Sequence, residues 1–73
     1  MKQATIKITE IRDIYELVRQ AESVEGDVIC SRGKYHVDCK SILGLFSLNL
    51  TEGFIIEYPE DAIGFENFIK QFM

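Results

Sequence analysis

Hydrophobic residues follow two different periods in the first part of the chain. Residues 1–9 place Ile6 and Ile8 between polar side chains, and this period of two predicts a strand. From Ile11 to residue 21 the apolar residues recur every three or four positions, which predicts a helix with one apolar face. Thr9 is the expected N-cap of this helix, which should end between residues 23 and 26.

The middle of the chain predicts a hairpin followed by a short helix. Residues 27–39 contain two short alternating stretches joined by the turn 31–34, in which Gly33 can adopt a positive φ. The segment 41–50 is mostly apolar and begins at Ser41, a good N-cap, so we expect a helix there. Gly44 weakens it by about 1 kcal/mol relative to alanine.

A strand and a final helix complete the pattern. Residues 51–58 predict a strand that is entered from Gly53 and that Pro59 ends, and Asp61 can cap a helix whose apolar residues extend to Phe72. The predicted order is βαββαβα in one domain, residues 1–73. Two layers satisfy this order most economically, with helices on one face of an antiparallel or mixed sheet, so the fold class is α+β.

Composition narrows the possible partners. The chain has 12 acidic and 8 basic residues and a net charge of −4, which disfavours binding to nucleic acid or to anionic membranes. The start of the sequence lacks the apolar core of a secretory signal, and no apolar run is long enough to span a membrane. We therefore expect a cytoplasmic protein with both cysteines reduced.

Residues 37–53, VDCKSILGLFSLNLTEG, resemble the segment around the regulatory serine of HPr, the histidine-containing phosphocarrier protein of the sugar phosphotransferase system. The matching positions are Lys40, Ser41, Ile42, Leu43, Gly44, Leu45, Phe46, Ser47, Leu48 and Gly53. The first strand and residues 15–30 are similar to the family as well. The resemblance implies an open-faced β-sandwich, in which a four-stranded antiparallel sheet carries three helices on one face.

The resemblance also implies that the phosphoryl-carrying histidine has been lost. Matching the first helix without gaps places Glu10 at the position of the histidine, Arg12 at the family's arginine and Asp13 at its proline. The loop before the helix is shorter than in the family. Asp13 and Glu16 add negative charge that repels phosphate.

The expected function is therefore a regulatory or adaptor protein, not an enzyme, that binds other proteins through its second helix and the neighbouring end of the first. The resemblance assigns partner binding to Lys40, Ile42, Leu43, Phe46 and Arg12, and regulatory phosphorylation to Ser41. A five-residue apolar cluster on so short a helix cannot be fully buried; we expect Leu45 and Leu48 in the core, with Leu43 and Phe46 more exposed. The family's partners are phosphotransferase components, a serine kinase or a transcription regulator.

Several alternatives remain open at this point. The chain could be an active phosphocarrier that uses Glu10 or His36, or a protein whose only role is to oligomerise; we expect a monomer or a weak homodimer. Cys30, His36 and Cys39 could bind a metal, but their spacing matches no zinc motif, and two buried thiols are the simpler interpretation. The sequence contains no catalytic triad and no phosphate-binding glycine loop, so no cofactor or metal is expected.

Overall fold

The strands and helices follow one another in the predicted order βαββαβα. The structure is a computed structural model that describes residues 1–73. The elements are β1 (Lys2–Ile6), α1 (Ile11–Glu22), β2 (Ile29–Arg32), β3 (Tyr35–Asp38), α2 (Ile42–Phe46), β4 (Phe54–Tyr58) and α3 (Ile63–Ile69), with short 3-10 helices η1 (Leu50–Glu52) and η2 (Lys70–Phe72). The fold class is confirmed as α+β.

The four strands form one antiparallel sheet in the order β1-β4-β2-β3. At the centre, Ile56 of β4 lies opposite Ala4 of β1 on one side and Cys30 of β2 on the other. Phe54, Ile56 and Tyr58 are buried, whereas Ile55 between them is 39% exposed. This alternation turns one face of the sheet toward the helices and leaves the other face open.

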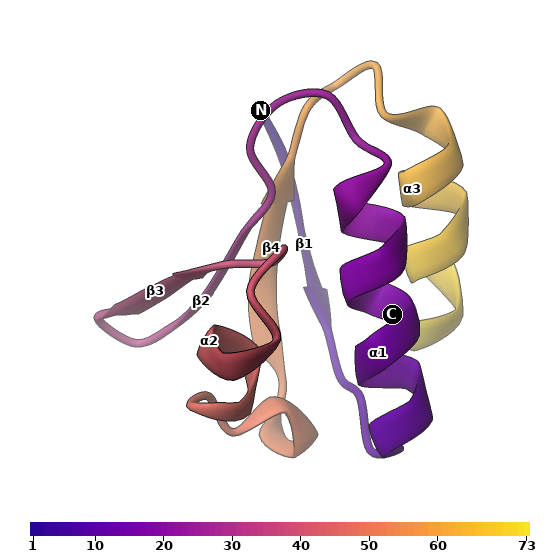
Figure 1. The fold of residues 1–73 in the computed structure, drawn as a ribbon. Coiled ribbons are helices and arrows are strands. Elements are labelled where there is room, and N and C mark those ends of the chain that lie inside the picture. Colours follow the sequence, from indigo (N-terminus) through magenta and orange to yellow (C-terminus); the bar gives the residue numbers. More distant parts are fainter.

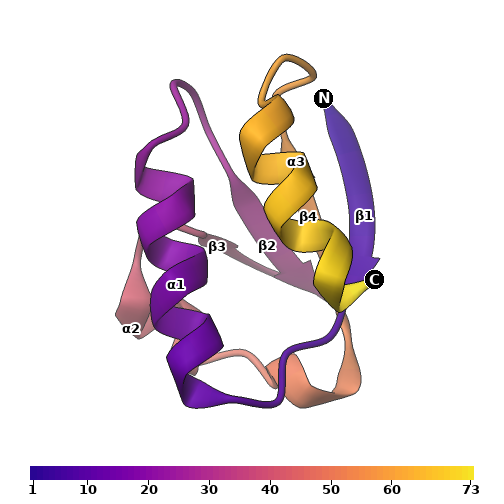
Figure 2. The same ribbon diagram turned by 90° about the vertical axis from the view of Figure 1, so that its right-hand side faces the viewer.

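Helices α1 and α3 lie side by side across the covered face (Figure 2). The apolar side of α1 buries Ile14, Leu17 and Ala21, as the spacing of three and four residues requires. From α3, Phe65 and Ile69 enter the same core. The core is therefore one continuous cluster between the sheet and these two helices.

Helix α2 lies beside the β2–β3 hairpin (Figure 1), contacts α1 and contributes Leu45 to the core. Gly44 packs tightly against β3, since a Cβ atom added there would meet the Cβ of Val37 at 3.2 Å, as well as the Oγ of Ser41 at 3.3 Å. The glycine that weakens the helix is thus explained by packing, because its missing side chain lets α2 approach β3.

The connection from β1 to α1 is short and is held at two points. The backbone N–H of Lys7 donates to the carbonyl of Phe72 (3.1 Å), and that of Ile8 donates to the carbonyl of Leu50 (3.2 Å). The start of α1 is therefore attached both to the C-terminal segment and to η1.

Three local predictions were wrong. The residue before α1 is Glu10, not Thr9, and it makes no side-chain cap bond. Ala62, not Asp61, precedes α3, because a turn closed by the Ala62 N–H and the Pro59 carbonyl (3.1 Å) keeps Asp61 outside the helix. The second helix ends at Phe46 instead of residue 50, since the Ser47 N–H and hydroxyl both donate to the carbonyl of Gly44 and tighten the last turn.

Candidate docking surface

Four large apolar side chains are exposed where the start of α1 meets α2. Ile11 and Tyr15 of α1 are 63% and 57% exposed, and Leu43 and Phe46 of α2 are 81% and 47% exposed. The rings of Tyr15 and Phe46 pack edge to face with centroids 6.1 Å apart. We call Ile11, Tyr15, Leu43 and Phe46 the α1–α2 patch. Apolar groups gathered in this way are typical of surfaces that bind other proteins.

A groove of about 260 Å³ adjoins the patch, between the start of α1 and the segment from α2 to η1. Ile11 and Phe46 of the patch line it together with Ile8, Ile14, Leu45, Leu48 and Leu50. Leu45 at the base is completely buried, and Leu48 is half-buried. Leu45 and the exposed pair Leu43 and Phe46 therefore lie as the sequence predicted, whereas Leu48, expected in the core, is only partly buried against it, as is Ile42.

The part of this surface that α2 and the following residues form carries no charge. No charged residue occurs between Ser41 and Thr51. Nearby charges come from the start of α1, where Glu10 and Arg12 are exposed and take part in no ion pair. A partner therefore meets an apolar centre with isolated charges at its α1 side.

Ser41 caps α2 as predicted. Its backbone is extended (φ −104°, ψ 107°), and its hydroxyl oxygen accepts a hydrogen bond from the N–H of Gly44 at 3.2 Å. The residue is exposed, so the hydroxyl lies at the surface beside the α1–α2 patch. This position combines a structural role with accessibility from solvent.

Lys40 is directed away from Ser41. Its ammonium group donates to the carbonyls of Val24 (3.0 Å) and Gly26 (2.9 Å), and its backbone N–H donates to the carboxylate of Asp38 (2.9 Å). These bonds fasten the segment before α2 to the loop that follows α1. In this arrangement Lys40 positions Ser41 and does not neutralise charge on it.

The two candidate phosphate carriers lie in different parts of the fold. Glu10 is exposed immediately before α1, with its carbonyl accepting from the N–H of Asp13 at 3.0 Å. His36 lies on β3 opposite Ser31, which pairs with Ile55, so His36 faces the open side of the sheet. The structure does not bring the single histidine to the start of α1.

The two cysteines are buried beneath the hairpin. Cys30 and Cys39 are both completely inaccessible. The neighbouring Cys39 thiol, burial and the negative charges nearby all raise the pKa of Cys30, which keeps the thiol protonated and unreactive. His36 faces the opposite side of the sheet, and no three histidine, cysteine or acidic residues come together as metal ligands.

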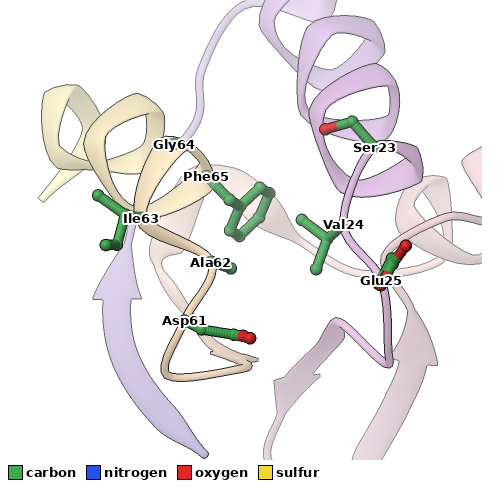
Figure 3. A pocket seen from close by; sticks show the side chains of 8 residues that line it. All are labelled: Ser23, Val24, Glu25, Asp61, Ala62, Ile63, Gly64 and Phe65. Atoms are coloured by element: carbon green, nitrogen blue, oxygen red, sulfur yellow. The ribbon is translucent and has the colours of Figure 1, made fainter.

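A second hollow, of about 290 Å³, lies between the end of α1 and the start of α3. In Figure 3 the side chains of Val24 and Phe65 point toward one another across it, and the carboxylates of Glu25 and Asp61 lie at its edge. These two carboxylates belong to no group of three potential metal ligands, whereas calcium takes about six to eight oxygen ligands. None of the predicted functional residues lines this hollow.

Sequence reasoning missed Ile11 and Tyr15 as parts of the surface. The two residues are four positions apart in the sequence, so their side chains share one side of α1. Ile11 belongs to the apolar period of the helix and was therefore assigned to its inner face. Ile11 is the first residue of α1, whereas the buried residues of this helix begin at Ile14. This position at the helix start is the signal that separates Ile11 from the core residues.

The element order, the open sheet face and the short helix beginning after Ser41 define an HPr-like open-faced β-sandwich. The structure is similar to HPr-C-His from Thermoanaerobacter tengcongensis, with a TM-score of 0.78 and 23% identity over 97% of this chain and 93% of that one. It is also similar to the phosphocarrier protein HPr from Bacillus anthracis str. Ames, with a TM-score of 0.72 and 17% identity over 99% and 96%. These likenesses establish the fold.

No family model matches the chain, and no curated protein matches it. None of the helices has both the length and the apolar character that crossing a membrane requires.

Proposed function

We propose that this chain is a regulatory or adaptor protein of the HPr type that carries no phosphoryl group on a histidine and binds a partner protein through the α1–α2 patch. The observation that carries the proposal is the exposure of Ile11, Tyr15, Leu43 and Phe46 around an apolar groove. Covering these side chains removes apolar surface from water, which favours association. Phosphotransferase components, a serine kinase or a transcription regulator of the bacterial cytoplasm are the candidate partners.

The start of α1 supports the loss of phosphocarrier chemistry. A histidine carrier needs a neutral imidazole nitrogen as nucleophile, and Glu10 offers a carboxylate at the corresponding place. Asp13 follows in the first turn of α1, so an incoming phosphate meets two acidic side chains, whereas the Glu16 carboxylate is bound to Gln20 and Arg19 further along the helix. The short, doubly held connection before α1 also leaves no long loop in which another nucleophile could be presented.

Phosphorylation of Ser41 is the proposed means of control. The exposed hydroxyl lies next to the α1–α2 patch, so a phosphate there adds about two negative charges to a segment without charged side chains. The change would alter partner affinity by charge alone. Lys40 would help to neutralise the phosphate only after releasing the carbonyls of Val24 and Gly26.

The phosphocarrier alternative is tested by incubating the protein with labelled phosphoenolpyruvate and the general phosphotransferase components. We expect no label on the protein. Labelling that disappears in Glu10→Gln or His36→Ala would overturn the proposal and identify the carrier residue. Incubation with a purified HPr serine kinase should label the wild type and not Ser41→Ala; equal labelling of both excludes Ser41 as the site.

Docking is tested with purified candidate partners and the variants Leu43→Asp and Tyr15→Asp. Each should weaken binding about tenfold or more, because a charge replaces an apolar contact. Ile63→Asp is the matched control, since Ile63 is also exposed (66%) but lies on α3. Equal effects at all three positions would contradict the α1–α2 patch. Light scattering of the free protein separates this function from simple self-association.

A further inference from the structure

The β2–β3 hairpin concentrates positive charge in an acidic protein. Residues 31–36 include Arg32, Lys34 and His36 and no acidic residue, although the whole chain has a net charge of −4. The hairpin extends beyond the rest of the sheet, next to α2 (Figure 1). A local excess of positive charge of this kind attracts anions.

A cleft of about 670 Å³ lies between the hairpin and the residues that follow α2. Arg32, Lys34 and Tyr35 line it from the hairpin, and Leu48 and Asn49 line it from the other side. No acidic residue lines the cleft. Its volume falls within the range of about 300–1,000 Å³ that is usual for small-molecule sites.

The two cations of the cleft differ in how they are held. Arg32 donates to the carbonyl of Gly53 (3.0 Å) and to the carboxylate of Glu52 (2.6 Å), which fixes its guanidinium group and offsets part of its charge. Lys34 makes no hydrogen bond or ion pair with the rest of the protein. Lys34 is therefore the free charge, and Arg32 is a fixed donor beside it.

The remaining lining suits a flat, partly apolar group. The side chain of Tyr35 is 65% exposed, so its ring is available for stacking. Leu48 supplies an apolar, half-buried surface opposite. The Asn49 amide oxygen accepts from the hydroxyl of Thr51 at 2.8 Å, which leaves the amide N–H groups free to donate.

We propose that this cleft binds a nucleotide, with the phosphate contacting Lys34 and Arg32 and the base lying between Tyr35 and Leu48. Phosphate and a flat ring are the two chemical groups that the lining recognises, and a nucleotide combines them in a molecule that the cleft can hold. The cleft contains none of the four residues of the α1–α2 patch, although it shares Leu48 and Asn49 with the groove beside that patch.

The test is a titration of the ¹⁵N-labelled protein with adenosine 5′-monophosphate, followed by NMR chemical shifts. We expect saturable shifts centred on residues 32–35 and 47–49. Lys34→Gln should weaken binding about tenfold, the effect of losing one charge-assisted contact. Lys70→Gln is the matched control, because Lys70 is an exposed lysine in η2 away from the cleft. Tyr35→Ala should weaken binding as well, because the base loses its stacking partner.

Adenosine and inorganic phosphate are titrated separately to measure how much the nucleoside and the phosphate each contribute to the affinity. Each should bind more weakly than the nucleotide. Equal shifts with inorganic phosphate alone would indicate an adventitious ion only and would overturn the proposal. The proposal is also overturned by shifts that do not saturate, by equal affinities of Lys34→Gln and Lys70→Gln, or by binding of an acidic peptide in place of the nucleotide.

Discussion

The hydroxyl of Tyr58 donates a 2.7 Å hydrogen bond to the carboxylate of Glu66, which also accepts from the ammonium group of Lys2 at 3.0 Å. The three residues join β4, α3 and β1 at one edge of the core. Burial and the bond to Glu66 raise the pKa of Tyr58 to about 12. The bonds from Tyr58 and Lys2 lower the pKa of Glu66.

An alkaline titration should reveal Tyr58. Its folded-state pKa lies above the ordinary value of 10.0, so its contribution to stability is complete below pH 10.0 and is lost as the pH rises toward about 12. We expect the tyrosinate absorbance of the native protein to include a late component in this range. Tyr58→Phe should remove that component, whereas Tyr35→Phe should leave it in place.

The contribution of Glu66 to the free energy of unfolding should fall when the solution is made acidic. Because its folded-state pKa is lowered, its contribution is present above its ordinary pKa of 4.5 and is lost as the pH falls through the folded-state value. Glu66→Gln should therefore be less stable than the wild type in urea at about pH 7, with a smaller difference at about pH 2.5. A difference that is constant with pH would show that the charge of Glu66 has no part in it.

Ser41→Ala should lower the free energy of unfolding by about 1 kcal/mol, because the N–H of Gly44 loses its acceptor. Ser41→Asp should retain most of the stability, since an aspartate side chain can accept the same bond. Urea unfolding of the three proteins measures both effects. If Ser41→Asp is as unstable as Ser41→Ala, the cap does not account for the loss.

Gly44→Ala should not stabilise the protein, although alanine favours a helix by about 1 kcal/mol relative to glycine. The new Cβ atom meets the Cβ of Val37 at 3.2 Å, so α2 has to move away from β3. We expect a loss of up to about 1 kcal/mol in urea unfolding. Val37→Gly removes the obstructing Cβ atom, so the double variant should lose less than the sum of the single variants. Additive losses would rule out this contact as the cause.

Cys30 and Cys39 should not react with an aromatic disulfide reagent in the native protein. Both are fully buried, and the raised pKa of Cys30 keeps its thiol protonated. Two thiols per chain should appear once urea unfolds the protein. Rapid labelling without denaturant would show that the hairpin opens readily and exposes its inner face.

Local periodicity explains which parts of the fold were predictable. The alternation around Ile56 and the helical spacing from Ile11 depend only on neighbouring residues, so the order βαββαβα follows from the sequence. Helix caps depend on turns of one or two residues, and the turn after Pro59 displaced the expected cap at Asp61. The strand order β1-β4-β2-β3 depends on pairing between distant residues and was not predicted; the resemblance to HPr implied only a four-stranded antiparallel sheet.

The candidate surfaces were less predictable because they join distant parts of the chain. Leu43 and Phe46 could be placed outside the core, since one short helix cannot bury five apolar side chains. The contact between Tyr15 and Phe46 depends on how α1 and α2 meet. Lys40 illustrates the same limit: its sequence neighbour is Ser41, yet its ammonium group is bound to the loop at Val24 and Gly26.

The bond from the Lys7 N–H to the Phe72 carbonyl has a practical consequence for anyone seeking the partner. A deletion that removes Phe72 takes away the acceptor of the Lys7 N–H and so loosens the connection that leads to α1. An interaction screen with such a shortened chain would present an altered docking surface. A fusion ahead of Met1, at the far end of β1, leaves this junction untouched.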